Sequence, residues 1–229
     1  NNLNNFIHFD FEKKRKIILL SKKVKKFERI KIEENLNWEK LELIEANKNH
    51  LSGLQLQEDY QRVYPQYEYF SHILGYISQP TQSDLKLPYI SKMPRLDIGK
   101  TGLEKYFNEN LVGRAGKREI EVNALGRVIR EISKQPSTNG KDINISIDHR
   151  VQQFCFNELE KYVAGSIVLL DIYSGEIISM VSMPSYDPNL IIEKPNFEYW
   201  QSLINNPLSP LTNRSIQGLY APGSTIKMI

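Results

Sequence analysis

The chain has 229 residues, of which 40% are hydrophobic, so it can bury one or two cores and shows no compositional sign of disorder. Its 30 basic and 27 acidic residues leave a net charge of +3, which is too balanced for a typical nucleic-acid-binding protein. No apolar run approaches the roughly 20 residues that a membrane-spanning helix requires. We therefore expect two globular domains and no nucleic-acid partner.

One strongly basic segment lies near the N-terminus. Clusters of lysine and arginine at 13–16 and 22–26 flank the apolar run at 17–20. This pattern favours a helix with a solvated basic face. An anionic membrane surface or an acidic partner is the alternative interpretation.

Short helices and strands are predicted along the first 140 residues. Hydrophobic spacing predicts strands over 28–33 and 54–56, helices over 38–44 and 70–77, and a polar loop over 78–96. Asn35 or Asn37 can cap the first of these helices. Residues 119–132 are typical of a hairpin that turns at 124–126. We place a domain boundary near Gly140, which gives domains of 1–140 and 141–229.

The second domain is predicted to begin with a strand and a helix. Isoleucines alternate with polar residues over 143–147, and Asp148 is a good N-cap for the helix that follows. Cys155 lies on the apolar face of that helix, so we expect a buried thiol. It is the only cysteine, so no intramolecular disulfide can form.

A hairpin over 165–183 and a long loop over 184–220 are expected to follow. Asp171 and Glu176 flank the hairpin turn. We interpret them as solvated turn residues rather than as a carboxylate pair for general acid–base catalysis. The four histidines lack acidic or cysteine partners at ligand spacing, so we expect neither a metal nor another cofactor. The order of elements suits an antiparallel sheet with a helix packed against it.

The candidate nucleophile and base lie near the end of the chain. Pro222 and Gly223 resist helix, so Ser224 is predicted at a helix N-terminus, with Lys227 one turn later on the same face. A lysine near pKa ~10.4 is protonated and cannot accept the serine proton. Burial that lowers this pKa to about 7 would make Lys227 a general base. The backbone N–H of Ser224 could also stabilise an oxyanion.

Spacing alone does not identify a catalytic pair. Ser83 and Lys86 have the same separation in a polar stretch with no sign of a buried helix start. The residues around Ser224 carry the additional signal. They resemble the penicillin-binding transpeptidase domains in two long runs, Gly165 to Asn189 and Asn213 to Lys227.

The upstream residues extend this resemblance. The runs Gly99 to Glu104 and Glu121 to Glu131 are similar to the pedestal of class B penicillin-binding proteins, closest to the elongation-type penicillin-binding protein 2 group. The resemblance implies an α+β fold, with a dimerisation-like pedestal followed by the first part of a serine β-lactamase-like transpeptidase domain. In that family the pedestal has no chemistry of its own.

The family places Ser-x-Asn and Lys-Thr-Gly motifs after the nucleophile. Here Ser137–Asn139 and Lys100–Gly102 precede it, so we interpret the first as a loop and the second as a pedestal turn. We therefore expect the chain to be a fragment that by itself neither acylates with penicillin nor turns over. The remaining motifs would follow Ile229, and a single membrane anchor would precede Asn1.

The resemblance implies that the parent protein is a D,D-transpeptidase on the periplasmic face of the bacterial inner membrane. Ser224 would attack peptidoglycan stem peptides ending in D-Ala-D-Ala, Lys227 would accept its proton, and β-lactams would acylate the same serine. Hydrolytic release, as in a carboxypeptidase or a β-lactamase, is one alternative. The other is a non-catalytic pedestal that binds membrane proteins of the elongation complex.

Overall fold

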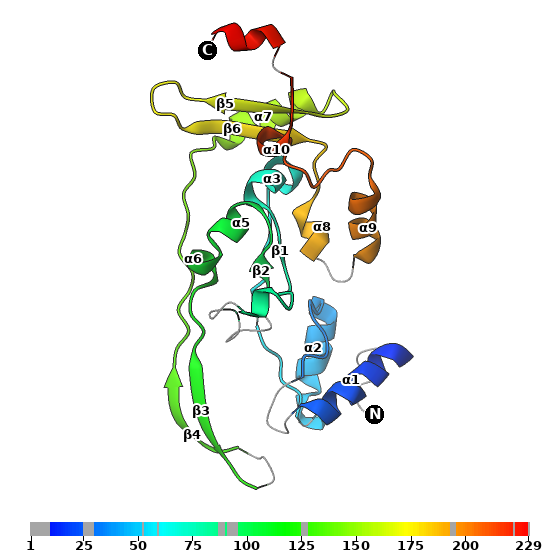
Figure 1. Ribbon diagram of the computed structural model, residues 1–229. Coiled ribbons are helices and arrows are strands. Elements are labelled where there is room, and N and C mark those ends of the chain that lie inside the picture. The colour runs from blue at the N-terminus through cyan, green and yellow to red at the C-terminus, as the bar shows by residue number, and fades with distance from the viewer. Residues whose placement is uncertain are drawn as a thin grey trace. The chain divides into compact units, whose positions relative to one another are not determined.

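The computed structural model describes residues 10–24, 30–51, 53–58, 60–86, 90, 96–124, 128–192, 196–221 and 223–228 (Figure 1). The chain forms two compact units. The first consists of 1–61 and 117–135, and the second of 62–116 and 136–229.

In its described residues, the first unit contains two α-helices, one 3-10 helix and a long hairpin. Its elements are α1 (Phe11–Lys23), α2 (Trp38–Ala46), the 3-10 helix η2 (Lys48–His50), β3 (Lys117–Val122) and β4 (Val128–Gln135). Asn37 caps α2 by accepting a hydrogen bond from the backbone N–H of Lys40 at 3.1 Å, as predicted. Ile44 and Leu51 form a small core, against which Ile17 of α1 packs. The predicted helix is present, and most of its other described side chains are exposed.

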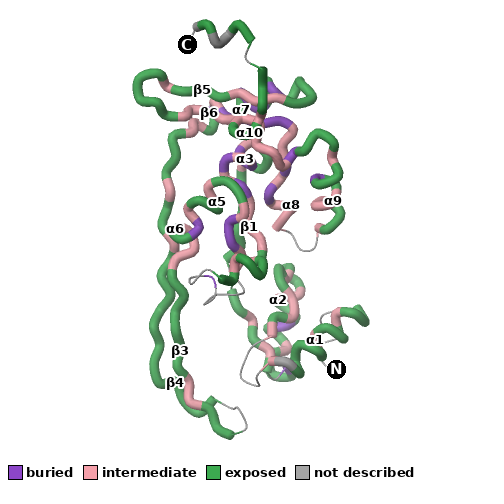
Figure 2. Tube along the Cα trace, viewed as in Figure 1, coloured by how far each residue is buried: buried purple, intermediate pink, exposed green. Residues whose placement is uncertain are grey.

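The hairpin of the first unit is confirmed. β3 and β4 pair antiparallel from Lys117 opposite Gln135 to Val122 opposite Val128. Figure 2 shows both strands exposed along almost their whole length. Cross-strand charges support the pairing, since Arg130 Nε lies 2.6 Å from Glu121 Oε2. Of the expected turn at 124–126, residues 125 and 126 lie outside the described residues.

The second unit contains the remaining elements. They are η3 (Tyr67–Phe70), α3 (Ser71–Leu74), β1 (Ile77–Ser78), η4 (Asp84–Lys86), β2 (Ile98–Gly99), α5 (Gly102–Tyr106), α6 (Asn108–Val112), α7 (His149–Leu159), β5 (Gly165–Leu170), β6 (Ile177–Met183), α8 (Pro188–Ile192), α9 (Phe197–Asn205), α10 (Arg214–Gln217) and η5 (Gly223–Met228). β5 and β6 form the expected antiparallel hairpin, and β1 pairs with β2.

The core of the second unit lies between α7 and the β5–β6 hairpin. It consists of Cys155, Phe156 and Leu159 from α7 with Val181 and Met183 from β6. Cys155 is therefore buried, as predicted. α7 begins at the expected N-cap, because Asp148 Oδ1 accepts hydrogen bonds from the backbone N–H groups of the next turn.

Several predicted elements are wrong. The predicted strands at 54–56 and 143–147 have no strand partner, and the described part of 28–33 is likewise not a strand. The helix predicted to reach Ile77 ends at Leu74, because Gly75 has a φ of +81° that no right-handed helix can continue. Where it is described, the predicted loop over 184–220 contains three helices, α8, α9 and α10.

Candidate active site

Ser224 and Lys227 both lie on η5, the 3-10 helix that ends the described part of the chain. A helix start at this point is therefore confirmed, and it begins one residue before Ser224, at Gly223. A 3-10 helix has three residues per turn, so side chains three residues apart are eclipsed. The hydroxyl of Ser224 and the amine of Lys227 consequently share one face of the turn. Pro222 lies outside the described residues.

Both residues of the pair are exposed to solvent. A lysine that serves as a general base must lose its charge, and low-dielectric surroundings are the usual means of removing it. The described residues do not provide such surroundings for Lys227. The structure thus brings the two side chains onto one face without enclosing them.

The segment that leads to the serine turn is fixed to the sheet. Asn213 caps α10, because its Oδ1 accepts a hydrogen bond from Ser215 N at 3.0 Å. Arg214 N donates to Ser182 Oγ at 2.9 Å, and Ser215 Oγ donates to Val181 O at 2.8 Å. The first turn of α10 is therefore held against the last residues of β6.

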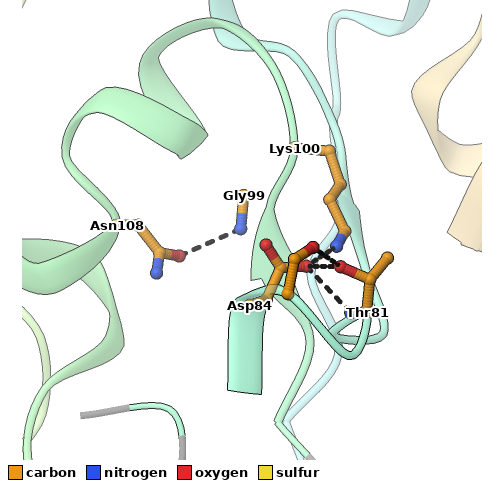
Figure 3. A network of polar contacts seen from close by, with 6 residues as sticks. Thr81, Asp84, Gly99, Lys100 and Asn108 are labelled. Carbon is orange, nitrogen blue, oxygen red and sulfur yellow. Dashed lines mark hydrogen bonds and ion pairs between the residues drawn. The ribbon is translucent and has the colours of Figure 1, made fainter. Parts of the chain in front are cut away.

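The Lys-Thr-Gly tripeptide at 100–102 lies far from this pair in sequence and has a local role. Lys100 Nζ lies 2.5 Å from Asp84 Oδ2, which also accepts hydrogen bonds from Thr81 N and Oγ1 (Figure 3). The hydrogen bond from Lys100 is the main reason why the pKa of Asp84 is well below its ordinary value. Lys100 is thus engaged by η4, which excludes a role for it on the serine turn in this structure.

The glycine of the tripeptide is required by the packing of α5 against α3. Gly102 has a φ of +59°, and a Cβ at this position would lie 2.5 Å from Ile73 O. The tripeptide is a turn between β2 and α5, as predicted, and its glycine permits the close approach of two backbones.

The Ser-x-Asn tripeptide at 137–139 also has a structural role. Thr138 pairs with Arg114 through two backbone hydrogen bonds of 2.9 and 3.0 Å. Gly113 lies against this bridge, because a Cβ at that position would lie 2.3 Å from Thr138 O. The tripeptide is consequently part of a short backbone bridge rather than of the candidate site.

The acidic pair of the β5–β6 hairpin belongs to its turn, as predicted. Asp171 Oδ1 accepts hydrogen bonds from the backbone N–H groups of Tyr173 and Ser174, both at 2.8 Å. These bonds lower the pKa of Asp171, the one from Ser174 contributing most. Across the described ranges, no three His, Cys, Asp or Glu side chains are grouped to hold a metal ion. Within those ranges there is also no helix of the length and apolarity needed to cross a bilayer.

His72 was missed by the sequence reasoning, because nothing near it in sequence indicates a role. Its Nε2 lies 2.8 Å from Pro210 O, so this nitrogen carries the proton and donates it. Burial lowers the pKa of His72 to about 4, and the positive charge of Arg214 adds to the effect. The imidazole is therefore neutral near pH 7 and lies beside the segment that leads to the serine turn.

Comparison with protein families assigns both parts of the chain. Residues 3–145 match the penicillin-binding protein dimerisation domain, and residues 165–229 match the penicillin-binding protein transpeptidase domain. The chain belongs to the penicillin-binding protein family. The expected order of a pedestal and a partial transpeptidase domain in an α+β fold is confirmed.

Several curated relatives carry the name peptidoglycan D,D-transpeptidase. The chain is 34% identical over 210 residues to the peptidoglycan D,D-transpeptidase MrdA of Escherichia coli K12, covering 88% of the chain and 32% of that protein. It is 32% identical over 183 residues to the peptidoglycan D,D-transpeptidase FtsI of the same strain, covering 77% of the chain and 26% of that protein. The chain spans about a third of the length of the MrdA proteins that it matches.

Solved structures of penicillin-binding protein 2 share the fold. The structure from Helicobacter pylori in complex with MreC is 26% identical with a TM-score of 0.78, covering 99% of this chain and 42% of that one. The structure from Pseudomonas aeruginosa in complex with WCK 5153 is 34% identical with a TM-score of 0.62, covering 76% of this chain and 34% of that one. The predicted similarity to penicillin-binding protein 2 is confirmed. The exact boundary near Gly140 and the roles of Ser224 and Lys227 stay predictions.

Proposed function

We propose that this penicillin-binding protein is a peptidoglycan D,D-transpeptidase with Ser224 as its nucleophile and Lys227 as its general base. One observation carries the proposal: the serine and the lysine share one face of η5, inside the region that matches the transpeptidase domain. The name of the MrdA relatives, peptidoglycan D,D-transpeptidase, supports the reaction type.

The proposed reaction proceeds in two acyl transfers. Ser224 Oγ attacks the carbonyl carbon between the two terminal D-alanines of a stem peptide, while Lys227 Nζ accepts the hydroxyl proton. The peptide bond breaks, the lysine returns the proton to the departing D-alanine amine, and an ester on Ser224 remains. The amine of a neighbouring stem peptide then attacks this ester and gives up a proton to Lys227, a new peptide bond forms as the ester C–O bond breaks, and the lysine returns the proton to Ser224 Oγ.

The first transfer requires two electrostatic conditions. Any lysine that acts as a general base near pH 7 needs a pKa lowered from ~10.4 to about 7, which corresponds to about 4 to 5 kcal/mol of differential destabilisation of the ammonium. The N–H of Ser224 lies in the first turn of η5 and is available for the developing oxyanion, which one such donor stabilises by roughly 2.7 to 4 kcal/mol. Because Lys227 is exposed here, we propose that further protein or the substrate encloses it.

β-Lactams are proposed as a second class of ligand. A strained lactam carbonyl presents the same electrophile as the terminal D-Ala-D-Ala bond, so Ser224 would open the ring and retain the acyl group. This reaction gives a stable covalent product on a known residue, which makes it suitable for testing the site.

Turnover of a stem peptide tests the reaction class. The full-length protein is incubated with a donor peptide that ends in D-Ala-D-Ala and with an amine acceptor, and the products are separated by mass. We expect a cross-linked product from the wild type and none from Ser224→Ala. Release of D-alanine without incorporation of the acceptor would instead indicate a carboxypeptidase.

We also propose that the protein binds an MreC-like protein of the elongation machinery on the periplasmic face of the inner membrane. The support is the likeness of this chain to the penicillin-binding protein 2 that was solved in complex with MreC. Binding of the MreC homologue from the same organism to the immobilised chain tests this function. Ser224→Ala should bind as well as the wild type, and an undetectable interaction for both would contradict the proposal.

A further inference from the structure

The start of α3 is the centre of a buried polar network in the second unit. Ser71 is 1% exposed, and its Oγ lies 2.7 Å from Ser185 Oγ, which donates to Glu68 O at 2.8 Å. Tyr186 OH donates to Ser71 O at 3.1 Å. The residues that follow β6 are thus attached to the start of α3 by side chains on both segments.

The next residue of α3 binds the segment that leads to the serine turn. His72 Nε2 donates to Pro210 O at 2.8 Å, and Asn213 Nδ2 donates to His72 O at 3.3 Å. The side chain and the main chain of one residue therefore hold two points of the segment that are three residues apart. The ring of His72 also packs edge-to-face on Tyr186, with centroids 5.3 Å apart.

These contacts join two regions that match different domains. His72 lies within the dimerisation-domain match, whereas Pro210 and Asn213 lie within the transpeptidase match. Asn213 has a second role, because its Oδ1 caps α10. The amide of Asn213 consequently couples the position of His72 to the first turn of α10. Only five residues separate the end of α10 from Gly223, where η5 begins.

We propose that His72 is a positioning residue for Ser224. Its imidazole and its backbone carbonyl bind Pro210 and Asn213, and these contacts fix the position of α10 relative to the sheet. The serine turn, which follows α10, is positioned as a result. The inference rests on the proposed role of Ser224 as the nucleophile. The burial that keeps the imidazole neutral is consistent with it, because a neutral ring has one N–H to donate and an unprotonated Nδ1 beside Ser71 Oγ at 3.4 Å.

The alternative is a purely structural role, in which loss of His72 weakens the fold without affecting the site. The two roles differ in one measurable quantity. A positioning residue lowers the rate constant of acylation at saturating penicillin, whereas a structural residue lowers the folding stability and leaves that rate constant unchanged.

The test uses the full-length protein and a fluorescent penicillin, with stopped-flow measurement of the acylation rate constant and of the drug concentration at half-saturation. His72→Phe keeps a ring beside Tyr186 but cannot donate to Pro210. We expect it to lower the acylation rate constant by about tenfold or more. His72→Gln, which places an amide N–H near the position of Nε2, should restore most of the rate.

Two further variants keep the test decisive if His72→Phe folds poorly. Asn213→Asp retains an oxygen to cap α10 but loses the N–H that binds His72 O, so it should also lower the acylation rate constant. The matched control is Tyr64→Phe, which removes a buried 3.2 Å hydrogen bond to Glu104 in the same unit. It should lower the thermal unfolding midpoint and leave the acylation rate constant unchanged.

The outcomes separate this inference from the function on which it rests. A wild type that forms no adduct at Ser224 would overturn the proposed function. If the wild type is labelled at Ser224, and His72→Phe and Asn213→Asp have the same acylation rate constant as the wild type, the positioning role alone is overturned. The positioning role is also overturned if Tyr64→Phe lowers the acylation rate constant as much as His72→Phe does. The decrease in rate would then result from lower folding stability.

Discussion

Gln152 is a buried polar side chain of α7 that joins this helix to β6 and to Tyr69. It is completely buried, and all four of its hydrogen-bonding positions are satisfied. Nε2 donates to Tyr69 O at 2.8 Å and to Met180 O at 2.9 Å, while Oε1 accepts from Met180 N and Ser179 Oγ, both at 2.9 Å. Its amide therefore binds the backbone of β6 much as a neighbouring strand would.

Gln152→Leu removes these four bonds while it changes the side-chain volume little. Tyr69 O, Ser179 Oγ and the N–H and C=O of Met180 would then each lose a partner. A buried group without its partner costs roughly 1–3 kcal/mol, so the two groups of Met180 alone give about 2–6 kcal/mol. This is a large part of the roughly 5–15 kcal/mol by which native domains are stable.

Urea unfolding of the chain followed by circular dichroism measures this loss. With a slope of about 2 kcal/mol per M, a loss of 3 kcal/mol lowers the urea midpoint by about 1.5 M. Gln153→Leu is the matched control, because Gln153 is the next residue of α7 and is exposed, and its change should stay within about 0.5 kcal/mol. Equal midpoints for the two variants would mean that the hydrogen bonds of Gln152 do not stabilise the fold.

Other predictions concern backbone conformation, a helix cap and a buried histidine. Gly102→Ala should lower the free energy of unfolding by more than about 1 kcal/mol, and thermal unfolding measures this change. The reason is that Gly102 has a φ of +59° and that a Cβ at this position would lie 2.5 Å from Ile73 O. Asp148→Ala should lower the urea midpoint at pH 7, and the difference from the wild type should shrink as pH falls through the lowered pKa of the folded carboxyl. The pKa of His72 is lowered to about 4, so the unfolded chain binds its proton first and stability falls as pH drops below about 6.5. Between pH 7 and pH 4.5 the wild type should lose about 2 to 3 kcal/mol of its free energy of unfolding through this group, and His72→Gln should lack this contribution. Equal losses in the wild type and in His72→Gln would contradict a buried neutral ring.

Features that depend on neighbouring residues could be predicted from the sequence. The caps at Asn37 and Asp148 and the hairpin of β5 and β6 are local, because each needs only a few consecutive residues. The Ser-x-x-Lys spacing is local as well. Helix geometry alone places residues three apart on one face, whether the helix is α or 3-10.

The wrong strands show the limit of alternating patterns. Leu54 and Leu56 alternate with polar residues, yet they pack against the core of Ile44 and Leu51 without pairing to another strand. A strand requires a partner as well as a pattern, and the pattern does not reveal the partner. The missed helix α9 did carry a readable signal, because its apolar residues follow a helical spacing after the N-cap Asn196.

The contacts that organise the second unit could not be predicted. Gln152 binds a residue 83 positions earlier in the chain, and His72 binds a residue 138 positions later. Neither residue differs in its sequence surroundings from an ordinary surface glutamine or histidine. Such contacts depend on which elements pack together, and this information lies in the fold rather than in any local window.

Mapping a penicillin adduct shows whether Ser224 is the acyl acceptor. The full-length protein is labelled with a penicillin and digested, and the modified peptide is sequenced by mass spectrometry. We expect a mass increase equal to the intact drug on Ser224 and no adduct in Ser224→Ala. An adduct on another residue, or undiminished labelling of Ser224→Ala, would contradict it.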